Sequence, residues 1–374
     1  MSTQRHRRSD VADALEDFRG PYTDSSEVTG DSRRHSDAEA MRRRFGFPEF
    51  DPDVFEWGLM PDVLIHSRDP AEGRVAGGTD LFAVGSPGSG KSTLANYLAV
   101  RLVELNGEKV VWRGSPSRSE WLPLAPWSTL WLPDGDVDAM LQPKDPRKSP
   151  VSVDVDDLEF VVREVRRYRT PRDLNTSMEP GINVVYPDPS LNGCQRALER
   201  SARQVEPPAE RETLFDREDP TKHWWFGWFL DRVDGGPHDW TTWVCDEIGD
   251  LCPQNARKDD YGTYQKVELQ KDTWVDARKH HLSVLGFGHS EADVHAMVRR
   301  KMRWRVAMPT AANPTSASGI VGFQSVPMRS DITSNWGPGK ALLYNESRFQ
   351  QFRWTDMPAG HGWKVQIRPI QQSQ

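Results

Sequence analysis

The chain has 374 residues, of which 36% are hydrophobic, and 48 basic against 55 acidic side chains give a formal net charge of −7. This balance excludes a globally basic nucleic-acid coat protein, so any contact with DNA must come from a local cluster of cations. No apolar run reaches 18 residues, so no membrane span is expected. Three cysteines offer neither a disulfide framework nor a zinc spacing, which indicates a reducing compartment. We expect a cytoplasmic protein, or a virion-associated one if a virus encodes it.

Residues 1–45 predict a disordered N-terminal arm. Residues 1–44 hold nine arginines, nine acidic residues and almost no periodic apolar pattern. Such a segment cannot bury enough surface to offset the entropy lost on ordering. A docking arm for a partner or for DNA is the alternative. Residues 46–374 are assigned to one folded domain.

Strand and helix patterns alternate from residue 80 onwards. Short apolar runs at 81–84, 109–112, 129–132 and 182–186 predict strands, whereas 92–104, 156–169 and 191–204 have helical spacing. This alternation favours an α/β fold with a mostly parallel central sheet.

The segment after the first strand fits G-x-x-x-x-G-K-[ST] at every fixed position, and a helix pattern follows it. Glycines let the backbone wrap around phosphate oxygens, whose charge meets aligned N–H groups at the start of the helix. Lys91 is expected to neutralise the β- and γ-phosphates, and the Ser92 hydroxyl to bind Mg²⁺. We predict that ATP and Mg²⁺ bind through Gly85, Ser86, Pro87, Gly88, Ser89, Gly90, Lys91, Ser92 and Thr93.

A later β-type run, 242–245, ends in the acid pair Asp246 and Glu247. Asp246 is predicted to hold Mg²⁺ through water, and Glu247 to polarise the attacking water. Combined with the phosphate-binding loop, this pair indicates an ATPase and disfavours small-molecule kinases. The long stretch at about 115–215 is interpreted as an insertion between the two nucleotide motifs.

A further apolar run, 281–288, predicts a strand that ends at His289. Motor ATPases place a polar sensor at this position, near the γ-phosphate, so His289 is a catalytic candidate; a surface-loop histidine is the alternative. Five cations then fall within seven positions, from Arg299 to Arg305. They form a solvated face, or they supply an arginine finger to a neighbouring subunit.

The order of these motifs resembles the FtsK/HerA group of P-loop ATPases. Residues 336–344 and 349–353 are also similar to that group's closing glycine turn and β-hairpin. The resemblance covers roughly residues 80–115 and 240–355. It implies a RecA-like core within 46–374, a C-terminal β-hairpin and a trans arginine at Arg299 or Arg305. It also implies a homo-oligomeric ring, with a hexamer as one candidate size, that pumps double-stranded DNA.

Departures from that group narrow the expected role. The group's sensor strand commonly ends in Gln followed by Arg, where this chain has Gly288 and His289. Its compact size fits a packaging or transfer motor of a virus or mobile element, with a virion or transfer-apparatus partner. A nucleotide-switched regulatory or scaffold protein and a protein-remodelling NTPase are the alternatives. The Trp-rich run 224–228 is assigned to core packing, with an oligomer interface or a nucleic-acid or lipid contact as alternatives.

Overall fold

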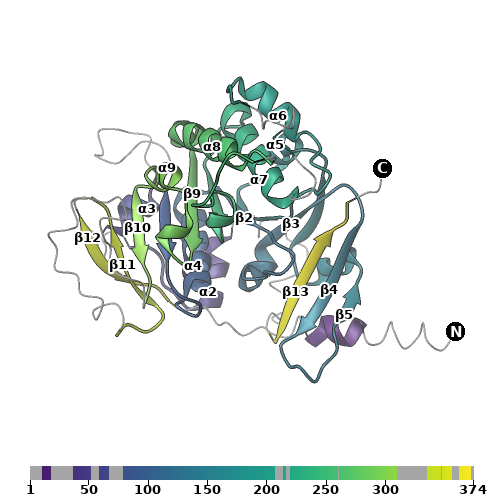
Figure 1. The fold of residues 1–374 in the computed structure, drawn as a ribbon. Coiled ribbons are helices and arrows are strands. Elements are labelled where there is room, and N and C mark those ends of the chain that lie inside the picture. Colours follow the sequence, from purple (N-terminus) through teal and green to yellow (C-terminus); the bar gives the residue numbers. More distant parts are fainter. Residues whose placement is uncertain are drawn as a thin grey trace.

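A ten-stranded sheet crosses the molecule in the order β12-β11-β10-β1-β9-β8-β2-β7-β3-β6 (Figure 1). The computed structural model describes residues 11–17, 37–51, 59–66, 79–206, 214–215, 220–259, 261–309, 335–346, 348–355 and 362–371. The strands in chain order are β1 (Leu81–Val84), β2 (Lys109–Arg113), β3 (Ser128–Pro133), β6 (Glu164–Tyr168), β7 (Gly181–Val185), β8 (Thr241–Cys245), β9 (Leu282–Gly288), β10 (Trp304–Ala307), β11 (Lys340–Tyr344) and β12 (Phe349–Arg353). All neighbours from β10 to β6 are parallel, and β10, β11 and β12 are antiparallel. The predicted mostly parallel α/β sheet and C-terminal β-hairpin are confirmed.

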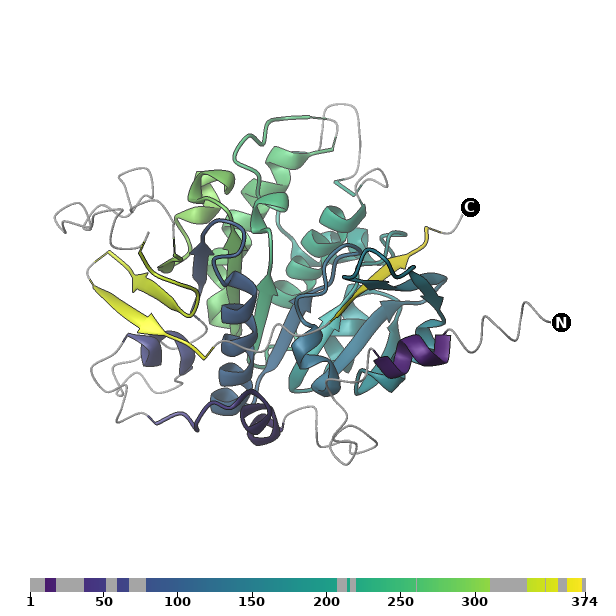
Figure 2. The ribbon, with the colours of Figure 1, turned by 90° about the horizontal axis from the view of Figure 1, so that it is seen from below.

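Helices cover both faces of this sheet. One face carries α2 (Ala38–Phe45), α3 (Met60–Leu64) and α4 (Lys91–Asn106); the other carries α5 (Pro171–Ser177), α6 (Cys194–Ser201), α7 (Pro220–Leu230), α8 (Thr263–Ala277) and α9 (Ala296–Arg299). Figure 2 shows α4 lying across the middle of the sheet. Strand side chains alternate between the two cores, because Leu81 and Ala83 face the α4 side whereas Phe82 and Val84 face the other. The short 3₁₀ or π segments are η4 (Leu122–Trp127), η5 (Val155–Phe160), η6 (Asp231–Gly235), η7 (Ile248–Asp250), η8 (Arg278–His280) and η9 (Glu291–Asp293).

A second, three-stranded sheet lies beside the first, in the order β13-β4-β5 (Figure 1). It joins β4 (Val137–Pro143) and β5 (Val151–Val153) to the last strand, β13 (Trp363–Pro369), in antiparallel pairs. The helical residues 11–17 lie next to it in both ribbon views, where Asp17 accepts a hydrogen bond from Trp363 Nε1 at 3.1 Å. The two ends of the described chain therefore meet at this sheet.

The segment predicted as an insertion extends the central sheet. Three strands of the 115–215 stretch, β3, β6 and β7, continue the sheet beyond β2. Leu130 of β3 and Ile182 and Val184 of β7 are fully buried in the same core as α4, and Val165 of β6 packs against it. This stretch shares the hydrophobic core of the nucleotide motifs, while its proposed boundaries remain a prediction.

The helix predicted over 156–169 is wrong. The chain forms η5 and then strand β6, which pairs with β3 in parallel. Arg163 donates to Thr129 Oγ1 at 2.6 Å, and Arg166 lies 2.7 Å from Glu164. Pairing with an existing sheet edge outweighs the local helical spacing, because strand formation depends strongly on tertiary partners.

The predicted disordered arm is wrong for residues 11–17, which are helical, and for its last eight residues, which form α2. Asp37 caps this helix by accepting from Ala40 N at 2.9 Å, and Gly46 ends it at φ +70°. Met41 is fully buried in the α4-side core, and Arg42 lies 2.9 Å from Glu104 on α4. Residues 1–10 and 18–36 of the arm lie outside the described residues.

The Trp-rich run is interior packing. Helix α7 is buried on all sides from His223 onward, with Trp224, Trp225 and Trp228 each 0% exposed. The Trp225 ring stacks on Trp243 of β8 at 5.4 Å between centroids, so α7 is tied to the strand that precedes the acid pair. Within the described ranges, no helix is long and apolar enough to cross a membrane.

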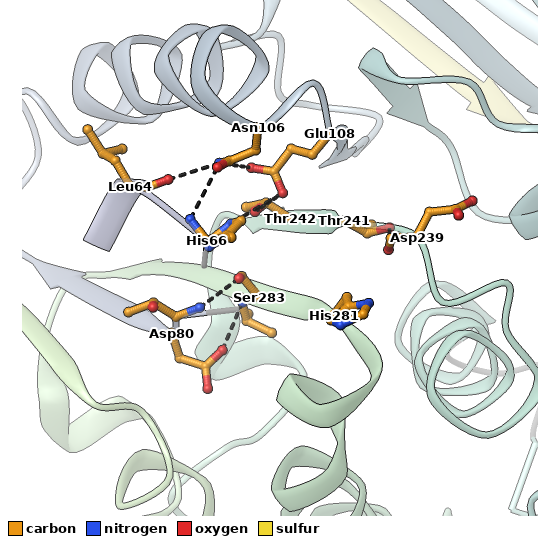
Figure 3. Close-up of polar contacts among 12 residues, drawn as sticks. Leu64, His66, Asp80, Asn106, Glu108, Asp239, Thr241, Thr242, His281 and Ser283 are labelled. Carbon is orange, nitrogen blue, oxygen red and sulfur yellow. Dashed lines mark hydrogen bonds and ion pairs between the residues drawn. The ribbon is translucent and has the colours of Figure 1, made fainter. Parts of the chain in front are cut away.

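A buried polar cluster closes the edge of the sheet where the parallel strands begin (Figure 3). His66 Nε2 lies 3.4 Å from Glu108 Oε2, and both side chains are 0% exposed. Glu108 also accepts from Thr242 Oγ1 at 3.1 Å and from Asn106 Nδ2 at 3.3 Å. Asn106 in turn donates to Leu64 O at 2.9 Å, so this cluster fastens the end of α3 to α4 and β8.

Candidate active site

The phosphate-binding loop joins β1 to α4 and directs the start of a 16-residue helix into a cavity. Gly88 and Gly90 have φ values of +79° and +92°, which favour glycine. A Cβ on Gly85 would come within 2.5 Å of the Met308 side chain. The loop therefore folds as the glycine pattern predicts.

Lys91 folds back over this loop. Its ammonium donates to Gly85 O at 2.6 Å and to Ser86 O at 3.1 Å. Partial burial lowers the pKa of Lys91, although Asp246 and Glu247 act in the opposite direction. The lysine thus stays close to both acids while its head lies over the loop.

The acid pair follows β8, two strands away from β1 in the sheet. Arg113 holds its backbone, because one Nη atom donates to Asp246 O at 2.5 Å and to Glu247 O at 3.1 Å. Glu247 has φ +50°, an uncommon conformation for a non-glycine residue. Both carboxylates are mostly buried, with side-chain exposures of 19% and 17%. The geometry fixes these two side chains at the edge of the cavity.

His289 lies in the same cavity, directly after β9. Its Nε2 lies 3.0 Å from Glu247 Oε1, and its side chain is 46% exposed. The strand order places β9 between β1 and β8, so the position predicted from the sequence is next to the acid pair. Its part in catalysis remains a prediction.

Sequence reasoning missed two charged residues of the site, Arg118 and Glu120. Arg118 donates to Asp246 Oδ2 at 2.6 Å and to Glu247 Oε1 at 3.0 Å. Glu120 lines the same cavity, and burial, followed by the charge of Asp246, raises its pKa. Both follow β2, whose carboxyl end lies beside that of β8. The sequence offered a signal for both residues, because polar side chains that follow parallel strands gather at one edge of the sheet.

The C-terminal glycine turn forms another wall. Pro338 lines the cavity, and Trp354 Nε1 donates to Thr93 Oγ1 at 3.1 Å. A Cβ on Gly90 would lie 3.1 Å from the Trp354 ring. The turn and hairpin named from the sequence therefore lie against the start of α4.

These groups line a cavity of about 570 Å³ that contains Lys91, Ser92, Asp246 and Glu247. Loop amides at a helix start suit phosphate, and a hydroxyl with a carboxylate offers the hard oxygen donors that Mg²⁺ prefers. Ser89 Oγ is buried with no hydrogen-bond partner among the described residues, which leaves a polar group inside the loop. The residues present therefore fit a magnesium-bound nucleotide.

The prediction that Arg305 is a trans finger is wrong. Arg305 is 1% exposed on β10, and its guanidinium donates to the carbonyls of Met302 and Arg299. It also lies 3.7 Å from Glu291. A side chain held in this way cannot reach another subunit. Arg299 is partly exposed and donates to Glu291 O at 2.6 Å; its assignment stays a prediction.

No protein-family model matches the sequence, and no curated protein matches it either. Among solved structures, the chain is similar to the genome packaging NTPase B204 of Sulfolobus turreted icosahedral virus 2, with 12% identity over 74% of this chain and 97% of that one, at a TM-score of 0.41. VirB4 of Thermoanaerobacter pseudethanolicus shows 12% identity over 75% and 90%, at a TM-score of 0.43. The cytoplasmic domain of the type VII secretion ATPase EccC from Thermomonospora curvata shows 14% identity over 76% and 26%, at a TM-score of 0.37.

Proposed function

We propose that the chain is a magnesium-dependent ATP hydrolase that works as an oligomeric DNA translocation or packaging motor of a virus or mobile element. One observation carries the hydrolase part: Lys91 and Ser92 at the start of α4 share a cavity with Asp246 and Glu247, which follow β8. A loop of this kind supports nucleotide binding, and a glutamate beside the metal-binding aspartate supports water activation.

Each residue has a role that follows from its position. Lys91 and the loop amides bind the phosphates. Ser92 and Asp246 would hold a magnesium ion, which would supply charge neutralisation at the phosphates. Glu247 accepts a proton from the attacking water, and His289, 3.0 Å from its Oε1, orients that carboxylate. Arg113 holds the backbone of the acid pair in place by donating to its two carbonyl oxygens.

The motor part rests on the order of the motifs and on their resemblance to the FtsK/HerA group. We propose a homo-oligomeric ring, with a hexamer as one size, that acts on double-stranded DNA together with a virion or transfer-apparatus partner. Arg299 is the remaining candidate for a trans arginine. The corresponding location is the cytoplasm, or the virion if a virus encodes the chain.

Two substitutions test hydrolysis. Lys91→Ala is expected to abolish nucleotide binding. Glu247→Gln should bind ATP normally and lose about a hundredfold or more in turnover, the usual share of a general base. Lys279→Ala, an exposed residue paired with Asp276 on the surface, is the matched control and should behave as the parent. Hydrolysis by Glu247→Gln at the parent rate would remove Glu247 from its role.

DNA decides between a motor and a nucleotide switch. A motor grips the phosphate backbone, so double-stranded DNA of any sequence should stimulate hydrolysis, and salt should weaken the effect. An ATPase rate that does not change with DNA at low salt would support the switch.

Mixing Glu247→Gln with Arg299→Ala subunits should restore part of the activity if an arginine acts between subunits.

A further inference from the structure

Arg118 forms ion pairs with both carboxylates on which the proposed hydrolysis depends. Its two Nη atoms donate separately, one to Asp246 Oδ2 at 2.6 Å and the other to Glu247 Oε1 at 3.0 Å. The second oxygen of Asp246 accepts from Glu247 N at 3.1 Å, and His289 shares the Oε1 atom of Glu247. Both carboxylates therefore already have hydrogen-bonding partners within the chain.

The pairing is held by a small, well-anchored loop. Arg118 N donates to Ser115 O at 3.1 Å, and Glu120 O accepts from Asn96 Nδ2 on α4 at 2.9 Å. The Arg118 side chain is 38% exposed and lines the cavity together with Lys91. Its guanidinium can thus leave the acids by rotation of the side chain while the backbone keeps its place.

We propose that Arg118 neutralises Asp246 and Glu247 before nucleotide binds and then turns its guanidinium to the phosphates of the bound nucleotide. The inference rests on the proposed nucleotide site. A guanidinium and a metal ion compete for the same carboxylate, since each satisfies its charge. Filling the cavity with a polyanion gives Arg118 a second partner and frees the acids in the same event. Nucleotide occupancy and acid availability are coupled in this way.

Melting of the nucleotide-free protein tests the first half without any turnover. In parent protein, Mg²⁺ alone should change the melting temperature little relative to EDTA, because Arg118 already neutralises the acids. Arg118→Gln should melt lower in EDTA and gain more from Mg²⁺, since two facing carboxylates are then left for the ion. Arg169→Gln is the matched control, because Arg169 is also paired with an aspartate, Asp134, at 3.0 Å but far out on the surface.

Nucleotide affinity tests the second half. Loss of a charge-assisted bond to the terminal phosphate should reduce the preference for ATPγS over ADP by about tenfold to a hundredfold in Arg118→Gln. Arg118→Lys keeps the charge and should retain part of this preference, which also covers the case in which the glutamine variant does not fold. An equal response to Mg²⁺ and an unchanged ATPγS-to-ADP ratio in both Arg118 variants would overturn the proposal. Failure of the parent itself to bind ATPγS would instead refute the nucleotide site.

Discussion

Asp80 makes the stability of the fold depend on pH near neutrality. This carboxyl precedes β1 and is 6% exposed. It accepts from Trp274 Nε1 at 2.8 Å and from Val284 N at 2.9 Å, next to Ser283 (Figure 3). Burial raises the pKa of Asp80 from 3.8 to about 7, although the two N–H bonds act against the rise.

The direction follows from where the proton is held. Between the unfolded and folded pKa values, the folded chain keeps this proton and the unfolded chain releases it. The contribution of Asp80 is therefore complete below about pH 4 and disappears as the pH rises through about 7. At about 1.4 kcal/mol per pH unit, the free energy of unfolding should fall by about 2 kcal/mol from this residue between pH 5.5 and 7.

Denaturant unfolding of the parent and Asp80→Asn across pH 5.5–8 measures this contribution. The amide never ionises, so the difference between the two free energies should change by about 2 kcal/mol over that range in favour of the variant. One of the two N–H donors loses its acceptor in the variant, which adds an offset that does not depend on pH. Asp138→Asn, on the exposed face of β4, should follow the parent. A difference that stays constant with pH would refute a buried, proton-holding Asp80.

Three further substitutions distinguish catalytic from structural roles. Glu120→Gln should keep turnover within about tenfold of the parent if Glu247 is the general base; in ATPase assays, a loss as large as that of Glu247→Gln would move the base to Glu120. Glu108→Ala removes the acceptor of Thr242 Oγ1 and Asn106 Nδ2 and should lower the free energy of unfolding by about 1–3 kcal/mol for each buried donor left unpaired, with Glu108→Gln much milder, as denaturant titration can show. Arg305→Ala should destabilise the fold by about 3 kcal/mol or more, and, when mixed with Glu247→Gln subunits, should restore no activity beyond what its own folded fraction explains.

Local patterns were sufficient for much of the site. The glycine loop, the acid pair and the strand before His289 each follow from short runs of residues whose conformations need few distant partners. The sheet order then brings them together, because the carboxyl ends of parallel strands share one edge. The fold class and the C-terminal hairpin were predictable for the same reason.

The wrong predictions involve residues whose state depends on distant partners. The 156–169 stretch has helical spacing, yet β3 offers it an open edge. The arginine run after β9 resembles a solvated or intersubunit face, yet Arg305 points into the sheet over Phe82. Arg118, which was missed rather than predicted wrongly, reaches the acid pair across 128 residues of sequence. No local window contains the information that decides these cases.

The contact of Trp354 with the start of α4 bears on the order in which the chain folds. Its bond to Thr93 spans 261 positions, and β13 meets β4 through contacts such as Gln366 to Gln142, which span 224. During synthesis, β1 and α4 emerge long before the residues that brace them, and long-range contacts of this kind form slowly. The phosphate-binding loop is thus synthesised early, whereas Trp354, which packs against it, is synthesised late. A growing chain should therefore bind nucleotide tightly only after the C-terminal hairpin has docked.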